Sequence, residues 1–170
     1  MGTVFQGLPP VYDGNSEMLI LGSFPSVKSR EAKFYYENPQ NRFWRVVAGV
    51  FEQDVPRTID EKRAFLLKNR IALWDVIASC EIEGSSDQKI KNATANDLTP
   101  ILNIADIRRI FVNGRRAEEY FHKLISPQIG RKAVYLPSTS PANAAMTLDR
   151  LIQEWSVIRR PNEEMFLQKR

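Results

Sequence analysis

Short apolar runs of strand length alternate along the chain with longer stretches of helical spacing. Four such runs are almost free of polar residues: 18–21 (MLIL), 71–77 (IALWDVI), 110–112 (IFV) and 133–136 (AVYL). Continuous apolar runs of this length, followed by turn-forming residues such as Gly22, Asn113 and Pro137, are typical of fully buried strands. The pattern therefore predicts four buried strands.

Apolar residues at spacings of three and four predict the helices. These patterns cover 42–51, 58–69, a short helix that starts within 94–97 and extends to about 105, then 117–125 and 141–155. Thr58 and Glu61 have capping-box spacing, and Ser140 before Pro141 predicts the N-cap and first residue of the last helix. The polar residues 83–96 predict an exposed loop that leads into the short helix.

Strands that alternate with helices indicate an α/β fold in which helices cover both faces of a parallel sheet. We therefore predict a three-layer α/β/α arrangement with a central four-stranded parallel sheet. The 170 residues are most simply one domain, residues 1–170, with residues 159–170 as a weakly anchored tail.

Composition narrows the chemistry that this fold can carry. Cys80 and His122 are the only cysteine and histidine, which excludes an internal disulfide and metal sites built from several thiolates or imidazoles. We expect no metal and no cofactor. No apolar run reaches the roughly 18 residues of a membrane span, so we expect a soluble, cytoplasmic protein without a membrane partner. The net charge of +4 permits a polyanionic partner.

Ligands of parallel sheets bind beyond the carboxyl ends of the strands, so the four strand exits are the places to search. They carry Ser23 and Phe24, Asp75, Asn113, and residues 138–141 (STSP). The amides after Ser140 would form a helix N-terminus suited to phosphate, although an ordinary capped helix explains the same residues. Neither a glycine-rich phosphate loop nor a GxSxG elbow occurs.

The segment YYENPQNRFW, residues 35–44, combines aromatic, amide and cationic side chains. Phe43 and Trp44 fit the helix and the core. Tyr36 and Phe24 could form an aromatic slot, and the amides of the segment could bind the polar edge of a planar heterocycle.

Six segments together resemble the uracil-DNA glycosylase superfamily, and most closely its hypoxanthine (deoxyinosine) branch. They are LILGSFPS (19–26), YYENPQNRFW (35–44), ALWDVI (72–77), GSSD (84–87), IFVNG (110–114) and LPSTSPANAA (136–145). The resemblance implies a four-stranded parallel sheet between helices. It also implies an enzyme that flips a deaminated base, most simply hypoxanthine, out of DNA and hydrolyses its N-glycosidic bond in base excision repair.

The resemblance also implies site residues. Many branches place a water-activating aspartate or asparagine in the loop that here reads 22–26 (GSFPS), which has neither. In the hypoxanthine branch this duty falls to an asparagine of PQNRFW, here Asn41, whose carbonyl would orient the water. For base binding we expect Ser23, Phe24, Tyr36, Asp75 and Asn113. For DNA binding we expect Ser26, Lys28, Arg42, Arg115, Ser138, Ser140, Pro141 and Asn143.

Two alternatives remain open. The NRFW segment is shared with mismatch-specific uracil or thymine glycosylases, and the loop at 22–26 without carboxylate or amide would also fit a non-catalytic module that binds damaged bases or DNA. In each case the expected partner is DNA, bound by a monomer in the nucleoid-containing compartment of a bacterium or archaeon.

Overall fold

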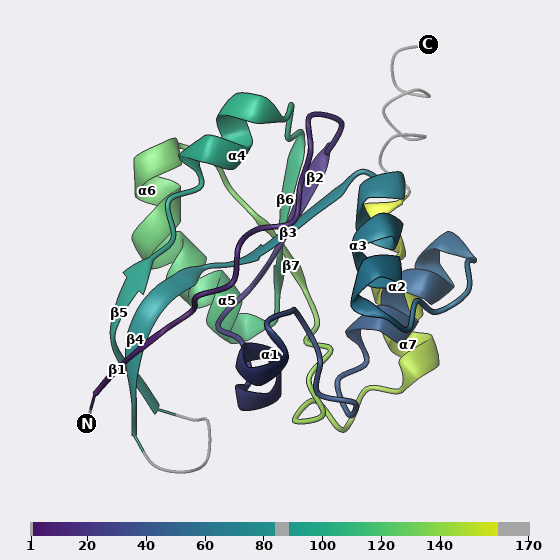
Figure 1. The fold of residues 1–170 in the computed structure, drawn as a ribbon, viewed down its shortest axis with the longest axis horizontal. Coiled ribbons are helices and arrows are strands. Elements are labelled where there is room, and N and C mark those ends of the chain that lie inside the picture. Colours follow the sequence, from purple (N-terminus) through teal and green to yellow (C-terminus); the bar gives the residue numbers. More distant parts are fainter. Residues whose placement is uncertain (1, 84–88, 160–170) are drawn as a thin grey trace.

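A four-stranded parallel sheet forms the centre of the protein (Figure 1). The computed structural model describes residues 2–83 and 89–159. The strand order is β3 (Ile71–Asp75), β2 (Met18–Gly22), β6 (Arg109–Asn113) and β7 (Val134–Leu136). All three neighbouring pairs are parallel, and every residue of β2 is buried. The four predicted strands are therefore confirmed, with β3 ending earlier than its apolar run.

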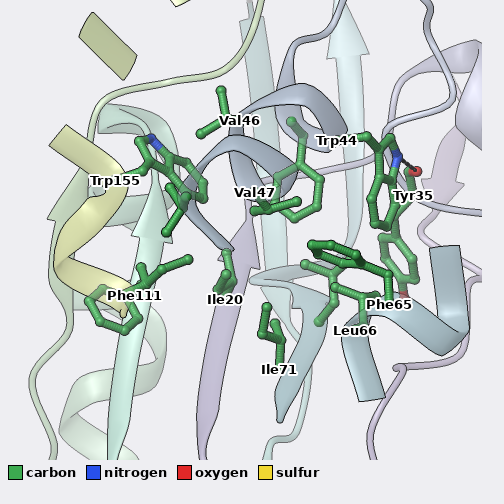
Figure 2. Close-up of a cluster of buried hydrophobic side chains, with 14 of the residues drawn as sticks. Ile20, Tyr35, Trp44, Val46, Val47, Phe65, Leu66, Ile71, Phe111 and Trp155 are labelled. Atoms are coloured by element: carbon green, nitrogen blue, oxygen red, sulfur yellow. Dashed lines mark hydrogen bonds between the residues drawn. The ribbon is translucent and has the colours of Figure 1, made fainter. Parts of the chain in front are cut away.

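Alternate residues of the strands face two separate cores. Ile20 of β2 faces a cluster with Trp44 and Trp155, shown in Figure 2, whereas Leu19 and Leu21 face a second cluster with Phe121. Such alternation is a direct consequence of the strand's period of two. Helices α2 (Phe43–Phe51), α3 (Ile59–Lys68) and α7 (Leu148–Trp155) cover the first face, and α4 (Thr99–Ile104) and α5 (Arg115–Tyr120) cover the second (Figure 1). The predicted α/β/α arrangement is confirmed.

Local sequence signals set several helix boundaries. The side chain of Thr58 accepts a hydrogen bond from the Glu61 amide at 3.1 Å, and the Glu61 carboxylate accepts one from the Thr58 amide, so the predicted capping box of α3 is present. After α5 the chain continues through a π-helical turn (Phe121–Ile125) into α6 (Ser126–Ile129). A short 3₁₀ turn (Ser156–Ile158) follows α7. Helix α1 (Val27–Ala32) was not predicted, and its N-cap is Ser26.

A second, three-stranded antiparallel sheet was not predicted. It has the order β1 (Thr3–Phe5), β4 (Ile77–Glu83) and β5 (Lys89–Ala95). The run 71–77 is thus two strands, because pairing with β2 ends at Asp75 and Ile77 already pairs with Ala95. The predicted loop over 83–96 is wrong for 89–95, and residues 84–88 lie outside the described part. Register shifts in β4–β5 break the alternation by which β5 could have been found.

The last helix starts seven residues later than predicted. Its first residue is Leu148, and its N-cap is Thr147, whose hydroxyl accepts a hydrogen bond from the Arg150 amide at 3.1 Å. Residues 137–147 instead form a loop of turns. Ser140 and Pro141 therefore do not open a helix, and the expected phosphate seat at a helix N-terminus is absent from this loop.

Trp155 fastens the end of α7 to the start of that loop. Its ring is fully buried with its edge toward Phe43, and its indole N–H donates to the Pro137 carbonyl at 2.8 Å. Arg159, the last described residue, donates to the Val50 carbonyl, so the predicted tail is anchored at its first residue. The remainder of that tail, 160–170, lies outside the described residues. Within the described residues, no helix has the length and apolarity needed to cross a membrane.

We expect Trp155→Phe to lower the free energy of unfolding by about 1–3 kcal/mol, because the Pro137 carbonyl loses its donor and the smaller ring leaves a void. Urea unfolding followed by circular dichroism measures the change. Phe5→Leu is the control, because the Phe5 ring is 70% exposed and its replacement should leave stability nearly unchanged. Equal stability of Trp155→Phe and the wild type would contradict the assigned role.

Candidate active site

The carboxyl ends of the four parallel strands bring separate loops together at one edge of the sheet. In Figure 1 this edge lies near α1, where the loop after β7 runs beside the segment that precedes α2. A backbone hydrogen bond of 3.0 Å from the Arg42 amide to the Thr139 carbonyl joins these two segments. Asn41, Asn113 and Thr139 consequently meet although they are far apart in sequence.

The carboxamide of Asn41 is held in one orientation. Its Oδ1 accepts a hydrogen bond from the Phe43 amide at 2.9 Å and another from the Thr139 hydroxyl at 2.8 Å. A backbone N–H can only donate, so the atom facing Phe43 must be the oxygen. Both acceptor positions of Oδ1 are thus occupied within the protein. Nδ2 has no hydrogen-bond partner in residues 2–83 and 89–159, and it is not enclosed.

This geometry corrects the expected role of the Asn41 carbonyl. An oxygen that already accepts two hydrogen bonds is not free to orient a water molecule, so that part of the prediction is wrong. The group that Asn41 presents outward is the Nδ2 donor. The predicted position is kept, and its chemistry is that of a hydrogen-bond donor.

Asn113 and Thr139 continue the network. Asn113 Nδ2 donates to the Thr139 hydroxyl at 3.0 Å and to the Tyr36 hydroxyl at 3.1 Å, and its Oδ1 accepts from the Thr139 amide at 3.1 Å. Both donor hydrogens of Asn113 are therefore used within the protein. Asn113 thus ties β6 to the two neighbouring loops, and its predicted contact with the base stays a prediction.

Thr139 was not among the predicted site residues, although it lies in a segment that was singled out. It is fully buried, with 0% of its surface exposed, and its hydroxyl joins Asn41 to Asn113. A threonine between two serines in a loop gives no sequence signal for such a position, because the contacts come from other strand exits.

The aromatic residues of 35–44 divide between core and site. Tyr35 is 2% exposed and belongs to the core with Trp44 (Figure 2). Its hydroxyl donates to the Pro9 carbonyl at 2.7 Å. Tyr36 has a positive φ of 54° and stacks on Phe43 with ring centroids 4.1 Å apart. Tyr36 packs with the first core and Phe24 with the second, and the aromatic slot expected between them stays a prediction.

Gly22 allows two polar side chains to approach the end of β2. A Cβ atom at this position would lie 2.5 Å from Asp75 Oδ1 and 2.8 Å from the Tyr36 hydroxyl, closer than contact distance. Gly22 and Asp75 are direct partners in the β2–β3 register. Glycine is therefore required here by space, because any side chain would displace the carboxyl or the phenol.

Burial dominates the electrostatics around Gly22. Asp75 is 4% exposed, and its burial raises the pKa of the carboxyl to about 7, against a smaller opposing effect of the hydrogen bond from Gln6. Burial, and then the nearby Asp75, raise the pKa of Tyr36. Because desolvation disfavours the charged form of each group, Tyr36 stays neutral and Asp75 titrates close to neutral pH.

Gln6 of the region after β1 was also missed. Its Nε2 donates to Asp75 Oδ2 at 3.2 Å, and its Oε1 accepts from the Leu8 amide at 3.0 Å. The second sheet therefore supplies a direct partner of a residue at the edge of the first sheet. No motif marks Gln6, and only the missed strand β1 could have indicated its place.

Several residues expected to bind DNA order the loops themselves. The Arg42 guanidinium donates to the carbonyls of Met146, Ser140 and Asn143, the last at 2.9 Å. Its cation therefore stabilises the 137–147 loop and is not a free phosphate ligand. Ser26 caps α1 by accepting from the Ser29 amide at 3.1 Å.

The other residues expected to bind DNA either form hydrogen bonds within the 137–147 loop or are exposed. Ser138 and Ser140 accept hydrogen bonds within the loop from the backbone amides of Ser140 and Ala142, and the side-chain Nδ2 of Asn143 donates to the Ser138 carbonyl. Pro141 and Lys28 are exposed. Arg115 is exposed too, pairs with Glu118 at 2.9 Å and stacks over the Tyr135 ring.

At the exit of β2, Ser23 and Phe24 are half-buried. The Ser23 carbonyl accepts from the Ile77 amide at 3.0 Å, and the Phe24 ring has the Arg30 guanidinium 5.6 Å from its centroid. In the described part of the chain, no three His, Cys, Asp or Glu side chains are grouped to hold a metal ion.

The comparisons with known proteins agree with this architecture. Residues 9–160 match the family model of the uracil DNA glycosylase superfamily. A hypoxanthine DNA glycosylase of Methanosarcina acetivorans is 40% identical over 155 residues, covering 90% of this chain and 96% of that protein. A second, from Methanosarcina barkeri, is 36% identical over 140 residues, covering 81% and 87%.

A solved structure extends the likeness to three dimensions. The solution NMR structure of a candidate uracil DNA glycosylase from Methanosarcina acetivorans superposes with a TM-score of 0.78 at 37% identity, covering 92% of this chain and 96% of that chain. With a family match over most of the described residues and a four-stranded parallel sheet of the same fold, the chain belongs to the uracil DNA glycosylase superfamily.

Proposed function

We propose that this protein is a DNA glycosylase that removes hypoxanthine from deoxyinosine in DNA, with Asn41 as the catalytic residue. The observation that carries the proposal is the 40% identity, across 90% of the chain, to a hypoxanthine DNA glycosylase. The arrangement at the sheet edge supports it, because Asn41 presents an amide donor beside the exits of β6 and β7.

The reaction hydrolyses one bond. The N9–C1′ bond breaks with its electron pair passing to the base, water adds its oxygen to C1′, and the proton released by the water ends on the free base. An oxocarbenium-like sugar lies close to the phosphates of DNA, which stabilise its positive charge, and N–H donors stabilise the negative charge on the departing purine. Asn41 cannot exchange a proton at neutral pH, so its contribution is a fixed hydrogen bond.

Recognition of the base requires that it leave the helical stack, at a cost of a few kcal/mol that is lowest for a mispaired lesion. We propose that Ser23 and Phe24 contact the everted base from the exit of β2. The Phe24 ring would supply a stacking surface. Asp75, in its ionised form, would accept the N1–H of hypoxanthine, with Tyr36 beside it at Gly22.

DNA itself would lie across the loops at this edge. Exposed Lys28 and Arg115 are the proposed phosphate contacts, and the tip of the 137–147 loop, which includes Pro141, would press into the minor groove. Arg42 would contribute indirectly, because its hydrogen bonds to three carbonyls hold that loop in position. We propose that the protein acts on DNA as a monomer.

A mismatch-specific uracil or thymine glycosylase is the second candidate. Its support is the solved relative at 37% identity, which is described as a candidate uracil DNA glycosylase. The third candidate, a module that binds lesions without cleaving them, has its support in the loop at 22–26, which carries no carboxylate or carboxamide.

We expect cleavage of duplexes that contain inosine, with slower cleavage of those that contain uracil, xanthine or a mismatched thymine. Labelled duplexes are incubated with excess protein, abasic sites are cleaved with alkali, and products are resolved on a gel. Faster cleavage of uracil than of inosine would favour the second candidate, and binding without any product would favour the third.

Asn41→Ala should slow single-turnover cleavage of the inosine duplex by about 100-fold or more, the usual effect of removing one such donor, and should change the affinity for DNA much less. Lys28→Ala is the contrasting variant, expected to weaken DNA binding and its salt dependence while leaving the rate at saturation unchanged. Equal losses of rate and of binding in Asn41→Ala would assign Asn41 a structural role.

The proposed role of Asp75 predicts a pH dependence of cleavage. The carboxylate that accepts N1–H forms only above a pKa of about 7, so the single-turnover rate should rise as the pH increases through about 7. Asp75→Asn should be slower and should lack this inflection. A wild-type profile without an inflection near 7, or an unchanged one in Asp75→Asn, would contradict the role.

The same carboxyl should affect stability in the opposite direction. Its pKa rises from 3.8 to about 7 on folding, so between these values the folded state holds a proton that the unfolded state has released. Its contribution to stability is therefore full below pH 4 and is lost as the pH rises to about 7. The wild type should lose on the order of a few kcal/mol over this window relative to Asp75→Asn, measured by urea unfolding at each pH.

A further inference from the structure

We propose that Thr139 is a positioning residue that makes Asn41 a hydrogen-bond donor toward the substrate. The proposal deepens the proposed function and relies on Asn41 as its catalytic residue. It rests on the direction of each hydrogen bond between Asn113, Thr139 and Asn41. None of these directions involves a charge.

The Thr139 hydroxyl lies between Asn113 and Asn41, and the direction of each hydrogen bond follows from the atoms involved. Thr139 Oγ1 accepts from Asn113 Nδ2 at 3.0 Å, so its own proton is available for Asn41 Oδ1 at 2.8 Å. The reverse direction is excluded because Asn41 Oδ1 has no proton to give. The hydroxyl therefore donates to Asn41.

Backbone N–H groups orient the carboxamides of Asn113 and Asn41, which lie on either side of the Thr139 hydroxyl. The Thr139 backbone N–H donates to Asn113 Oδ1 at 3.1 Å, which directs Asn113 Nδ2 toward the hydroxyl. The Phe43 N–H does the same for Asn41 Oδ1 at 2.9 Å. Because backbone N–H groups only donate, neither carboxamide can turn over without leaving a donor unpaired in or near the interior.

Thr139 itself is held in place by burial and by its backbone. It is 0% exposed, and its backbone carbonyl accepts from the Arg42 amide at 3.0 Å, next to Asn41 in sequence. The hydroxyl therefore has little room for another rotamer.

This network leaves the Asn41 amide only an N–H donor to offer to the substrate. With both acceptor positions of Oδ1 filled, the free part of the Asn41 amide is Nδ2, and hydrogen bonds to an amide oxygen polarise its N–H bonds further. A polarised donor stabilises negative charge on the departing base and cannot activate water by accepting a proton. Removing the Thr139 hydroxyl would free one lone pair of Oδ1 and leave the side chain held only by the Phe43 amide.

The test compares Thr139→Val, which keeps the shape and removes the hydroxyl, with Thr139→Ser, which keeps the hydroxyl. We expect single-turnover cleavage of inosine to fall roughly 10- to 100-fold in Thr139→Val, the size of effect that misplacement of a catalytic group produces, with DNA affinity within about threefold of the wild type. Thr139→Ser should restore most of the rate. Thr94→Val, which removes a hydroxyl bonded to Ser79 in the other sheet, is the matched control and should cleave normally.

Two further variants test coupling and chemical role. Thr139→Val combined with Asn41→Ala should be no slower than Asn41→Ala alone, because Thr139 acts through Asn41. Asn41→Asp cannot donate when ionised, so it should lose activity at neutral pH as a donor role requires. Full activity of Thr139→Val, failure of Thr139→Ser to restore the rate, a further loss in the double variant, or an active Asn41→Asp would each overturn the proposal.

A readout that needs no cleavage separates this proposal from the proposed function. In ¹⁵N-resolved NMR spectra, the side-chain NH₂ signals of Asn41, identified by their loss in Asn41→Ala, should shift or exchange-broaden in Thr139→Val and stay in place in Thr139→Ser and Thr94→Val. Unchanged signals in Thr139→Val would overturn the role of Thr139 even if the lesion is cleaved. Absence of cleavage for every lesion, with these shifts observed, would overturn only the proposed function.

Discussion

Burial of β2 on both faces is the constraint on which the rest of the structure depends. Its residues are packed between helices on both sides, and its backbone groups pair with β3 and β6 in parallel. Parallel pairing places the carboxyl ends of these strands at one edge, so every loop that leaves them must cross the same small region. The site therefore follows from the central strand, because Gly22, Asp75 and Asn113 are the last residues of β2 and its two neighbours.

The loops at this edge must satisfy their polar groups without the regular ladders of a sheet. They do so with side chains: Arg42 binds three carbonyls of the 137–147 loop, and Asn113 binds both the backbone and the side chain of Thr139. In a partly buried region an unpaired donor or acceptor costs about 1–3 kcal/mol. For this reason, polar side chains that look like ligand-binding groups in the sequence often form hydrogen bonds within the protein, as those of Arg42, Ser26 and Asn113 do.

The sequence was sufficient for the four strands and the two helical layers, because continuous apolar runs and helical spacing are local signals. The family was indicated separately, by the resemblance of six short segments. The sequence was insufficient where non-local pairing decides. Strand β5 has a broken alternation, and its identity depends on β4; the start of α7 depends on Thr147, not on the Ser140–Pro141 pair that resembles a helix start more closely. In the site, Asn41 was found from its motif, whereas Thr139 and Gln6 act through partners 98 and 69 positions away, which no local pattern reveals.

The network at Asn41 differs in kind from the group at Asp75. The Asn41 carboxamide is oriented by the backbone amide of Phe43 and the hydroxyl of Thr139, neither of which titrates, so it keeps one direction at every pH at which the protein is folded. Asp75, by contrast, changes charge near neutral pH because burial raises its pKa to about 7. A carboxylate at position 41 would be repelled by the anionic leaving base, whereas an amide held with its donor outward adds no charge to the site. The division leaves charge-dependent recognition to Asp75 and charge-independent stabilisation to Asn41.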